Sequence, residues 1–234
     1  MARRKKVRRN RNGTSMVDKV AGNNEWHTPP SALVPVKAYG PIGLDPCTAP
    51  HNPTGADVFY IEADNGLAQD WSDKGLVFVN PPYSTLDQLP DDATPEEKLA
   101  AKRAYMSELR DQGEELFDLP RSYVSSLIVL WAVKIHQEVR RGVELIALLP
   151  CGARFSTDYW QEHILIHELR ALCFVKGRID FIDGATGLPG KGNNYDSTFY
   201  GFNVNRSRFC SAFASTGACF EMRRPRAGVL DGFI

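Results

Sequence analysis

The residues of this chain with the clearest chemical potential are Asn80, Pro81, Pro82 and Tyr83, which follow one another directly. The prolines lack a backbone N–H and have a fixed φ, so the Asn80 side chain and nearby carbonyls point away from any preceding sheet. An amide oxygen, a carbonyl and the Tyr83 ring can together hold a planar amine, because two acceptors meet its two N–H bonds and the ring stacks. The segment predicts a site that modifies a planar amine, although Asn-Pro-Pro can also simply end a strand.

A short apolar strand must position this segment. Residues 76–79 read Leu-Val-Phe-Val, a pattern typical of a strand buried on both faces. The surrounding chain alternates such strands with helical patterns, which predicts an α/β fold with a single sheet and flanking helices. We expect further strands at 41–45, 57–61, 143–149, 171–175, 179–182 and 197–204. We expect helices at 124–140 and 157–170, and a third helix whose apolar-periodic part is 32–39.

Acidic residues end two of the other predicted strands. Asp45 ends one strand and is followed by Pro46 and Cys47, and Glu62 and Asp64 follow the next strand. Ligands bind at the carboxyl ends of strands in open α/β sheets, so these acids and Asn80 are expected to share one pocket. Asp45 can hold an ammonium or a ribose hydroxyl, and it can equally cap the turn that follows it.

The helix predicted at 32–39 has a capping signal before it. Thr28 is predicted as the N-cap and Pro29 as the first helical residue. Backbone N–H groups at a helix start suit a carboxylate or a phosphate, although most capped helices bind nothing. In the helix at 124–140, the apolar side is predicted to pack on the sheet, and Lys134 and Glu138 fall outside it.

The N-terminus is strongly basic. The chain has 28 basic and 28 acidic residues, but residues 1–11 hold seven of the basic ones and no acid, which leaves the rest net acidic. Such an arm cannot fold alone and can lie along phosphates, so nucleic acid is the expected partner, with a solubilising tail as the alternative. The seven basic residues are Arg3, Arg4, Lys5, Lys6, Arg8, Arg9 and Arg11.

Length and composition predict one main domain. The 234 residues are 43% hydrophobic, which suffices for a full core at 25–234, after a disordered arm and linker at 1–24. Within it, the segment at about 86–120 holds ten acids against four bases and one helical pattern, so we expect an exposed insertion outside the catalytic core. Five cysteines without a Cys-x-x-Cys pair, and the lack of a long apolar run, favour a reduced, cytoplasmic protein without a membrane segment.

Metal binding is not expected. His163 and His167 lie four apart on a predicted helix, which is a possible ligand spacing, but no third ligand is evident. The glycine-rich stretch at 184–194 lacks the Gly-x-x-x-x-Gly-Lys-Ser/Thr pattern of a phosphate-binding loop.

Taken in order, these motifs resemble the phage-encoded, Dam-like DNA adenine-N6 methyltransferases. The collinear order of the motifs, over about residues 25–205, is more specific than any one of them. The motifs are Trp26-His27-Thr28-Pro29, Leu44-Asp45-Pro46-Cys47, Asp64-Asn65-Gly66-Leu67 with Trp71, Asn80-Pro81-Pro82-Tyr83-Ser84, Leu148-Leu149-Pro150 and Gly177-Arg178-Ile179-Asp180-Phe181.

The resemblance implies a Rossmann-like class I methyltransferase fold and transfer of a methyl group from S-adenosylmethionine to N6 of a flipped adenine in DNA. It assigns Asn80, Pro81, Pro82 and Tyr83 to catalysis. It also implies that the basic arm, Ser84 and Arg178 contact DNA, and that the protein is located in the cytoplasm of the host cell. It implies that the cofactor is bound by Trp26, Thr28, Pro29, Asp45, Pro46, Cys47, Glu62 and Asp64. A glycine-rich turn common in methyltransferases does not follow Asp45, so this pocket is expected to have a different shape.

Two other functions fit the same residues. A protein glutamine N-methyltransferase would hold a planar amide in the same way, but the basic arm and the lack of a separate substrate domain favour DNA. A catalytically inactive DNA-binding module of the same fold is the alternative from another class. The intact Asn80–Tyr83 segment argues against it.

Overall fold

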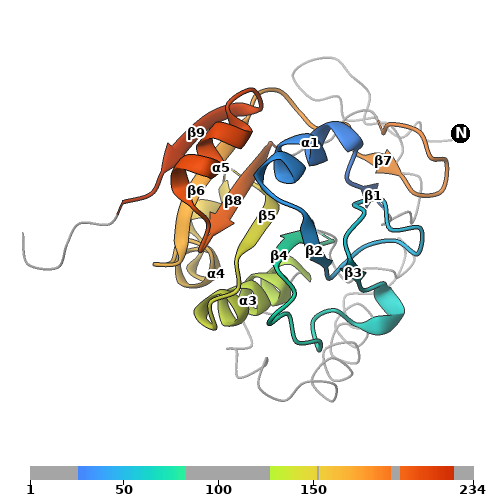
Figure 1. The fold of residues 1–234 in the computed structure, drawn as a ribbon, viewed down its shortest axis with the longest axis horizontal. Helices are drawn as coiled ribbons and strands as arrows, with labels where there is room; N and C mark the ends of the chain where they lie inside the picture. Colours follow the sequence, from blue (N-terminus) through green and yellow to red (C-terminus); the bar gives the residue numbers. More distant parts are fainter. Residues whose placement is uncertain (1–25, 83–126, 152, 191–195, 224–234) are drawn as a thin grey trace, which may run out of the picture.

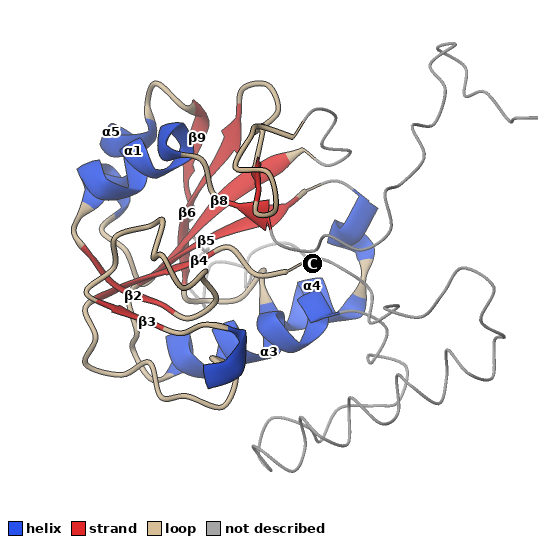
Figure 2. Ribbon diagram, turned by 90° about the vertical axis from the view of Figure 1, so that its right-hand side faces the viewer, coloured by secondary structure: helices blue, strands red, loops and turns tan. Residues whose placement is uncertain are grey.

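A computed structural model describes residues 26–82, 127–151, 153–190 and 196–223. Within these residues, seven strands form one mixed sheet with helices on both faces (Figure 1). Helices α1 (Pro30–Tyr39) and α5 (Arg206–Phe213) contact each other on one face, and α3 (Leu127–Arg140) and α4 (Asp158–His163) contact each other on the other (Figure 2). The predicted α/β class is therefore confirmed.

Four parallel strands make up one side of the sheet. Their order is β3 (Val58–Phe59), β2 (Ile42–Asp45), β4 (Leu76–Val79) and β5 (Leu145–Pro150). Helix α3 precedes β5 and covers one face of this part of the sheet. Because the four strands run in one direction, their carboxyl ends meet at one edge of the sheet.

The other side of the sheet contains antiparallel pairs. Strand β8 (Ser197–Phe202) lies between β5 and β6 (Leu169–Val175) and is antiparallel to both. Strand β9 (Gly217–Glu221) pairs with β6 at the far edge, also antiparallel. Strand β6 therefore runs in the same direction as β5, and its last residues lie at the same edge as the carboxyl end of β4.

The prediction of a single sheet was wrong, because a second, two-stranded sheet holds the first described residues against the domain. Strand β1 (Trp26–His27) pairs with β7 (Ile182–Asp183) in antiparallel register. The Trp26 ring packs against Gly190, where a Cβ atom would lie only 2.2 Å from a ring carbon, so a larger residue at this position would displace the ring. Pairing and packing together fix the chain just before α1.

Strand β4 is buried on both faces, as the Leu-Val-Phe-Val pattern predicts. Val77 and Val79 join the core beneath α3, whereas Leu76 and Phe78 join the core beneath α1 and α5. All four side chains are nearly inaccessible to solvent. Asn80 is thus attached to a strand that cannot shift without disturbing both cores.

Most predicted elements are confirmed, and several boundaries were wrong. The predicted helix at 157–170 ends at His163, because the chain from Leu169 pairs with β8 and continues as β6. The predicted strand at 57–61 is only Val58–Phe59 and leads into the 3-10 helix η1 (Glu62–Asp64), and the strand expected at 179–182 contributes only to β7. A second 3-10 helix, η4 (Ala153–Ser156), precedes α4. The basic arm and linker at 1–24 and the insertion at about 86–120 lie outside the described residues.

Candidate active site at the carboxyl edge of the sheet

Asn80 is held through both its backbone and its side chain. Its Nδ2 donates a hydrogen bond of 2.9 Å to Oγ1 of Thr28. Its backbone N–H hydrogen-bonds the sulfur of Cys47, which follows the neighbouring strand β2. Pro81 is buried and Pro82 is half-buried, whereas Tyr83 and Ser84 lie outside the described residues. The amide of Asn80 thus lies where three segments of the chain meet.

Thr28 does not cap α1 as predicted. The helix begins at Pro30, one residue later than expected, and its N-cap is Pro29 with no side-chain cap. Pro29 is extended (φ −68°, ψ 152°) because a residue before proline is disfavoured in the helical region. The Thr28 side chain is consequently not at the N-cap, and its hydroxyl accepts the hydrogen bond from Asn80 instead.

Asp45 is buried at the carboxyl end of β2, with only 3% of its surface exposed. Its Oδ1 accepts a hydrogen bond from the Cys47 backbone N–H at 3.1 Å, and its Oδ2 accepts one from the Thr54 hydroxyl at 2.8 Å. Burial raises the pKa of Asp45 to about 6, although these hydrogen bonds and one from Thr48 oppose the shift. Asp45 therefore caps its own loop, which was one of the two roles considered from the sequence.

Cys47 connects the two strand ends. Burial, and then the charge of Asp45, raise the pKa of the Cys47 thiol well above its usual value, and the hydrogen bond from the Asn80 backbone opposes this only in part. A thiol with a raised pKa is neutral and a poor nucleophile. Cys47 consequently serves to join the Asp45 turn to the Asn80 segment.

Glu62 and Asp64 lie on η1, next to the Asp45 turn, and both side chains are exposed. Asp64 Oδ2 accepts a hydrogen bond of 2.9 Å from the Ile61 N–H, which stabilises the turn. Directly after η1, the Gly66 backbone packs on the Pro46 carbonyl, from which a Cβ atom at Gly66 would be only 1.9 Å away. Glycine at this position lets the two loops that carry the acidic residues come together.

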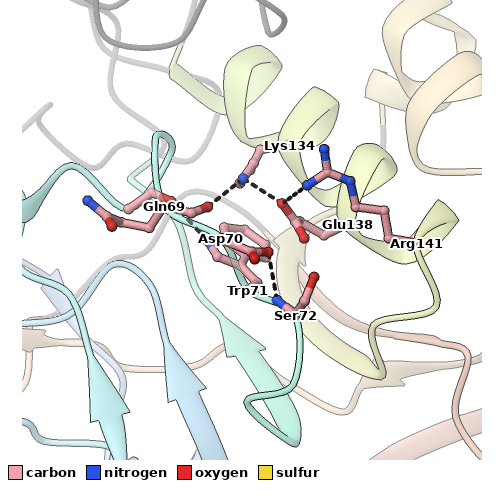
Figure 3. Close-up of polar contacts among 8 residues, drawn as sticks. Gln69, Asp70, Trp71, Ser72, Lys134, Glu138 and Arg141 are labelled. Carbon is pink, nitrogen blue, oxygen red and sulfur yellow. Dashed lines mark hydrogen bonds and ion pairs between the residues drawn. The ribbon is translucent and has the colours of Figure 1, made fainter.

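A buried ion pair on α3 anchors the loop that follows η1 (Figure 3). Lys134 Nζ lies 2.5 Å from Glu138 Oε1 and donates a hydrogen bond of 2.6 Å to the Gln69 carbonyl. It also lies 5.2 Å from the centre of the Trp71 ring, and the Trp71 indole N–H donates to the Gly66 carbonyl at 2.9 Å. The loop thus has a fixed place beside the Asp45 turn.

The prediction that Lys134 and Glu138 lie outside the buried side of α3 was wrong. Lys134 is 5% exposed and Glu138 is 0% exposed. A lysine four residues before a glutamate can be paired inside a protein when both charges gain hydrogen bonds, as these do from Gln69 and Arg141. The four-residue spacing of Lys134 and Glu138 was the only feature of the sequence that could have indicated this buried ion pair.

Two other predicted site residues lie at the rim. Trp26 is 47% exposed beside Thr28, and Arg178 is exposed after β6, with its Nε 3.5 Å from Asp196 Oδ1. The Cys151 N–H donates to the Asp196 carbonyl, which places this ion pair at the carboxyl end of β5. The structure thus links Thr28, Asp45, Cys47 and Asn80 directly through hydrogen bonds, and it places Trp26 and Arg178 at the same edge of the sheet. The arm residues that were expected to bind DNA lie outside the described residues.

The two histidines considered for metal binding do not share a helix. Helix α4 ends at His163, and His163 Nδ1 lies 2.8 Å from Nδ1 of His136 on α3. Burial is the main cause that lowers the pKa of both histidines. Among the described residues, no group of three or more His, Cys, Asp or Glu side chains could hold a metal ion.

Comparison with known protein families shows that this protein is a methyltransferase. A family model described as DNA N-6-adenine-methyltransferase (Dam) matches residues 15–205. The chain belongs to this Dam family, and at the level of the family its reaction is adenine-N6 methylation of DNA. The resemblance to Dam-like enzymes noted from the sequence is therefore confirmed.

Neither the curated proteins nor the solved structures include a match to this chain. None of the helices in the described part of the chain is long and apolar enough to span a membrane.

Proposed function

We propose that this protein transfers a methyl group from S-adenosylmethionine to N6 of an adenine that is flipped out of DNA. The observation that carries the proposal is the position of Asn80. Its amide is fixed by Thr28 at the carboxyl end of β4 and is followed by two prolines, in a chain of the DNA N-6-adenine-methyltransferase family.

Asn80 and Pro81 would act on the amine of the substrate. The Asn80 Oδ1 and the Pro81 carbonyl would accept the two N6 protons, which increases electron density on nitrogen and directs its lone pair. N6 cannot be approached in line inside a duplex, so the base must leave the stack, and Tyr83 would stack on it. Catalysis would then come from positioning and electrostatics.

The topology supports a Rossmann-like class I fold. Strands β4 and β5 are parallel neighbours, and the chain between them includes helix α3. Helices cover both faces, and the polar residues lie beyond the carboxyl ends of the strands, where open α/β sheets bind their ligands.

The residues at this edge fit S-adenosylmethionine, which would supply the methyl group on a sulfonium. Glu62 presents an exposed carboxylate next to the Asp45 turn, suited to ribose hydroxyls. We propose that Pro46, Cys47 and Asp64 complete this side of the pocket and that Trp26 and Pro29 border the methionyl end.

Asp45 has both carboxylate oxygens hydrogen-bonded within its own loop, so it would shape the cofactor pocket. A buried acid with a raised pKa reduces stability at neutral pH, and such groups are concentrated at functional sites.

DNA would contact the rim of the site and the basic arm. Arg178 is exposed at the carboxyl edge, and Ser84 follows the Asn80–Tyr83 segment in the sequence. The seven charges between Arg3 and Arg11 would add affinity without reading bases. The family match favours DNA over a glutamine side chain as substrate, and the Asn80 geometry favours an active enzyme over an inactive binding module.

The test is methyl transfer to adenine-containing oligonucleotides with labelled S-adenosylmethionine. Asn80→Ala should lower the single-turnover rate by about a hundredfold or more while cofactor affinity, measured by calorimetry, stays near that of the parent. Ser31→Ala, which removes an exposed hydroxyl from the start of α1, is the matched control. An Asn80→Ala variant with the parental rate would falsify the assignment, and transfer to glutamine peptides alone would favour the other methyltransferase.

A further inference from the structure

The contact between Thr28 and Asn80 joins residues 52 positions apart in the sequence. Only 6% of the Thr28 surface is exposed, and Asn80 is half-buried. A buried hydroxyl that is paired with a side-chain amide holds that amide in place, because breaking the contact costs the hydroxyl a hydrogen-bond partner away from water.

Thr28 itself lies in a rigid frame. On its N-terminal side, Trp26 and His27 pair with β7. On its C-terminal side, two prolines restrict the backbone, and the Pro29 carbonyl accepts the hydrogen bond from Ala32 that begins α1, at 3.0 Å. The hydroxyl consequently has little freedom to follow Asn80 if the amide rotates.

The two ends of a side-chain amide are chemically different. The nitrogen can only donate hydrogen bonds and the oxygen can only accept them. The exocyclic amine of adenine presents N–H donors, so an amide that is turned by 180° would direct its own N–H groups at them. The contact with Thr28 places Nδ2 of Asn80 on the Thr28 side and therefore places Oδ1 at the opposite end of the amide.

From this geometry we infer that Thr28 is a positioning residue, whose hydroxyl pairs with Asn80 Nδ2 and holds the amide with its oxygen at the end away from Thr28, where it can accept from the amine of the substrate. The inference rests on the proposed function and assigns Thr28 a role distinct from contact with the cofactor. In that role, loss of the hydroxyl affects the methyl-transfer step and leaves cofactor binding in place.

Single-turnover methylation at saturating cofactor and DNA separates these roles. Thr28→Val keeps the shape of the side chain and removes the hydroxyl, so the rate should fall about tenfold, the factor that corresponds to one ordinary hydrogen bond. Thr28→Ser restores the hydroxyl and should recover most of the rate. In an Asn80→Ala background, Thr28→Val should lower the rate no further, because its effect passes through the amide.

The contact can also be measured without activity. The side-chain amide protons of Asn80 give an NMR signal that is identified by its loss in Asn80→Ala. In the parent, hydrogen exchange of this group should be slow, and Thr28→Val should speed it at least several-fold, whereas Ser31→Ala should not.

Two results would overturn the inference while the parent still methylates adenine. One is a parental rate or parental amide exchange in Thr28→Val, and the other is weaker cofactor binding with no loss of rate at saturation. A parent that methylates no adenine would instead overturn the proposed function, and with it the catalytic role of the contact. The expected pattern is a slower rate, faster amide exchange and unchanged cofactor affinity.

Discussion

Asp45 connects the chemistry of the sheet edge with the stability of the protein. Its carboxyl is buried, and its pKa is raised from 3.8 to about 6. A raised folded-state pKa means that the folded protein binds the proton more tightly than the unfolded chain does. The stabilisation from this proton is fully present below pH 3.8 and is lost as the pH rises through 6.

The shift corresponds to about 3 kcal/mol, since each pKa unit is worth about 1.4 kcal/mol. Asp45→Asn removes the titration and keeps an oxygen to accept from the Cys47 N–H. The Thr54 hydroxyl lies 3.2 Å from Asn52 Oδ1, so it can donate its proton to Asn52 and accept a hydrogen bond from the side-chain amide that Asp45→Asn introduces. The unfolding free energy of Asp45→Asn relative to the parent should therefore increase by about 2 kcal/mol between pH 4.5 and 7.5.

Urea unfolding at several pH values measures this difference directly, because the other titrating groups are common to both proteins and cancel. Asp57→Asn removes an exposed carboxylate from the same part of the chain and should not reproduce the pH dependence. A difference between Asp45→Asn and the parent that stays constant across this range would refute the argument that burial of the Asp45 charge reduces stability.

Two other predictions concern the ion pair on α3 and the basic arm. Lys134→Met leaves the buried Glu138 with only the more distant Arg141, at 3.5 Å, as a cationic partner and should cost about 3 kcal/mol in urea unfolding, whereas the exposed Arg140→Met should cost under about 1 kcal/mol. A loss that is not substantially recovered in the Lys134→Met/Glu138→Leu double variant would show that the charge pairing is not the cause. Removal of residues 1–11 should weaken DNA binding and reduce its dependence on salt concentration, and an unchanged slope would exclude the arm from the phosphate contacts.

The sequence predicted the part of the site that depends on strand ends. The apolar run at 76–79 and the prolines after it placed Asn80 at a sheet edge, and Asp45 was placed at the end of the adjacent strand. These predictions succeeded because a short continuous apolar run and proline act locally, whatever the rest of the chain does. Helix α5 and strand β9 were not predicted, because the helix is short and the strand is largely exposed.

The contacts between segments could not be read from local patterns. Thr28 before two prolines looked like a helix cap, and only the pairing of β1 with β7 brings its hydroxyl to Asn80. Lys134 and Glu138 were predicted to face solvent, whereas Gln69 and Trp71, from the loop that follows η1, lie against Lys134. In both cases a polar residue gained its partner from a distant segment, and that choice depends on tertiary packing.

The acids at the strand ends and Asn80 are held by different kinds of contact, within one loop and between segments respectively. The acids at the strand ends are bound by their own loops: Asp45 accepts from Cys47 and Thr54, and Asp64 accepts from Ile61. Asn80 is bound instead by Thr28 and Cys47, from two different segments. Substitutions in the acidic loops should therefore first change the local shape of the proposed cofactor pocket, whereas changes at Thr28 should act on the orientation of the Asn80 amide. Cys47 belongs to both sets, because it contacts Asp45 and the Asn80 backbone. Cofactor affinity and methyl-transfer rate can accordingly be separated by mutation, because they depend on different sets of hydrogen bonds at one edge of the sheet.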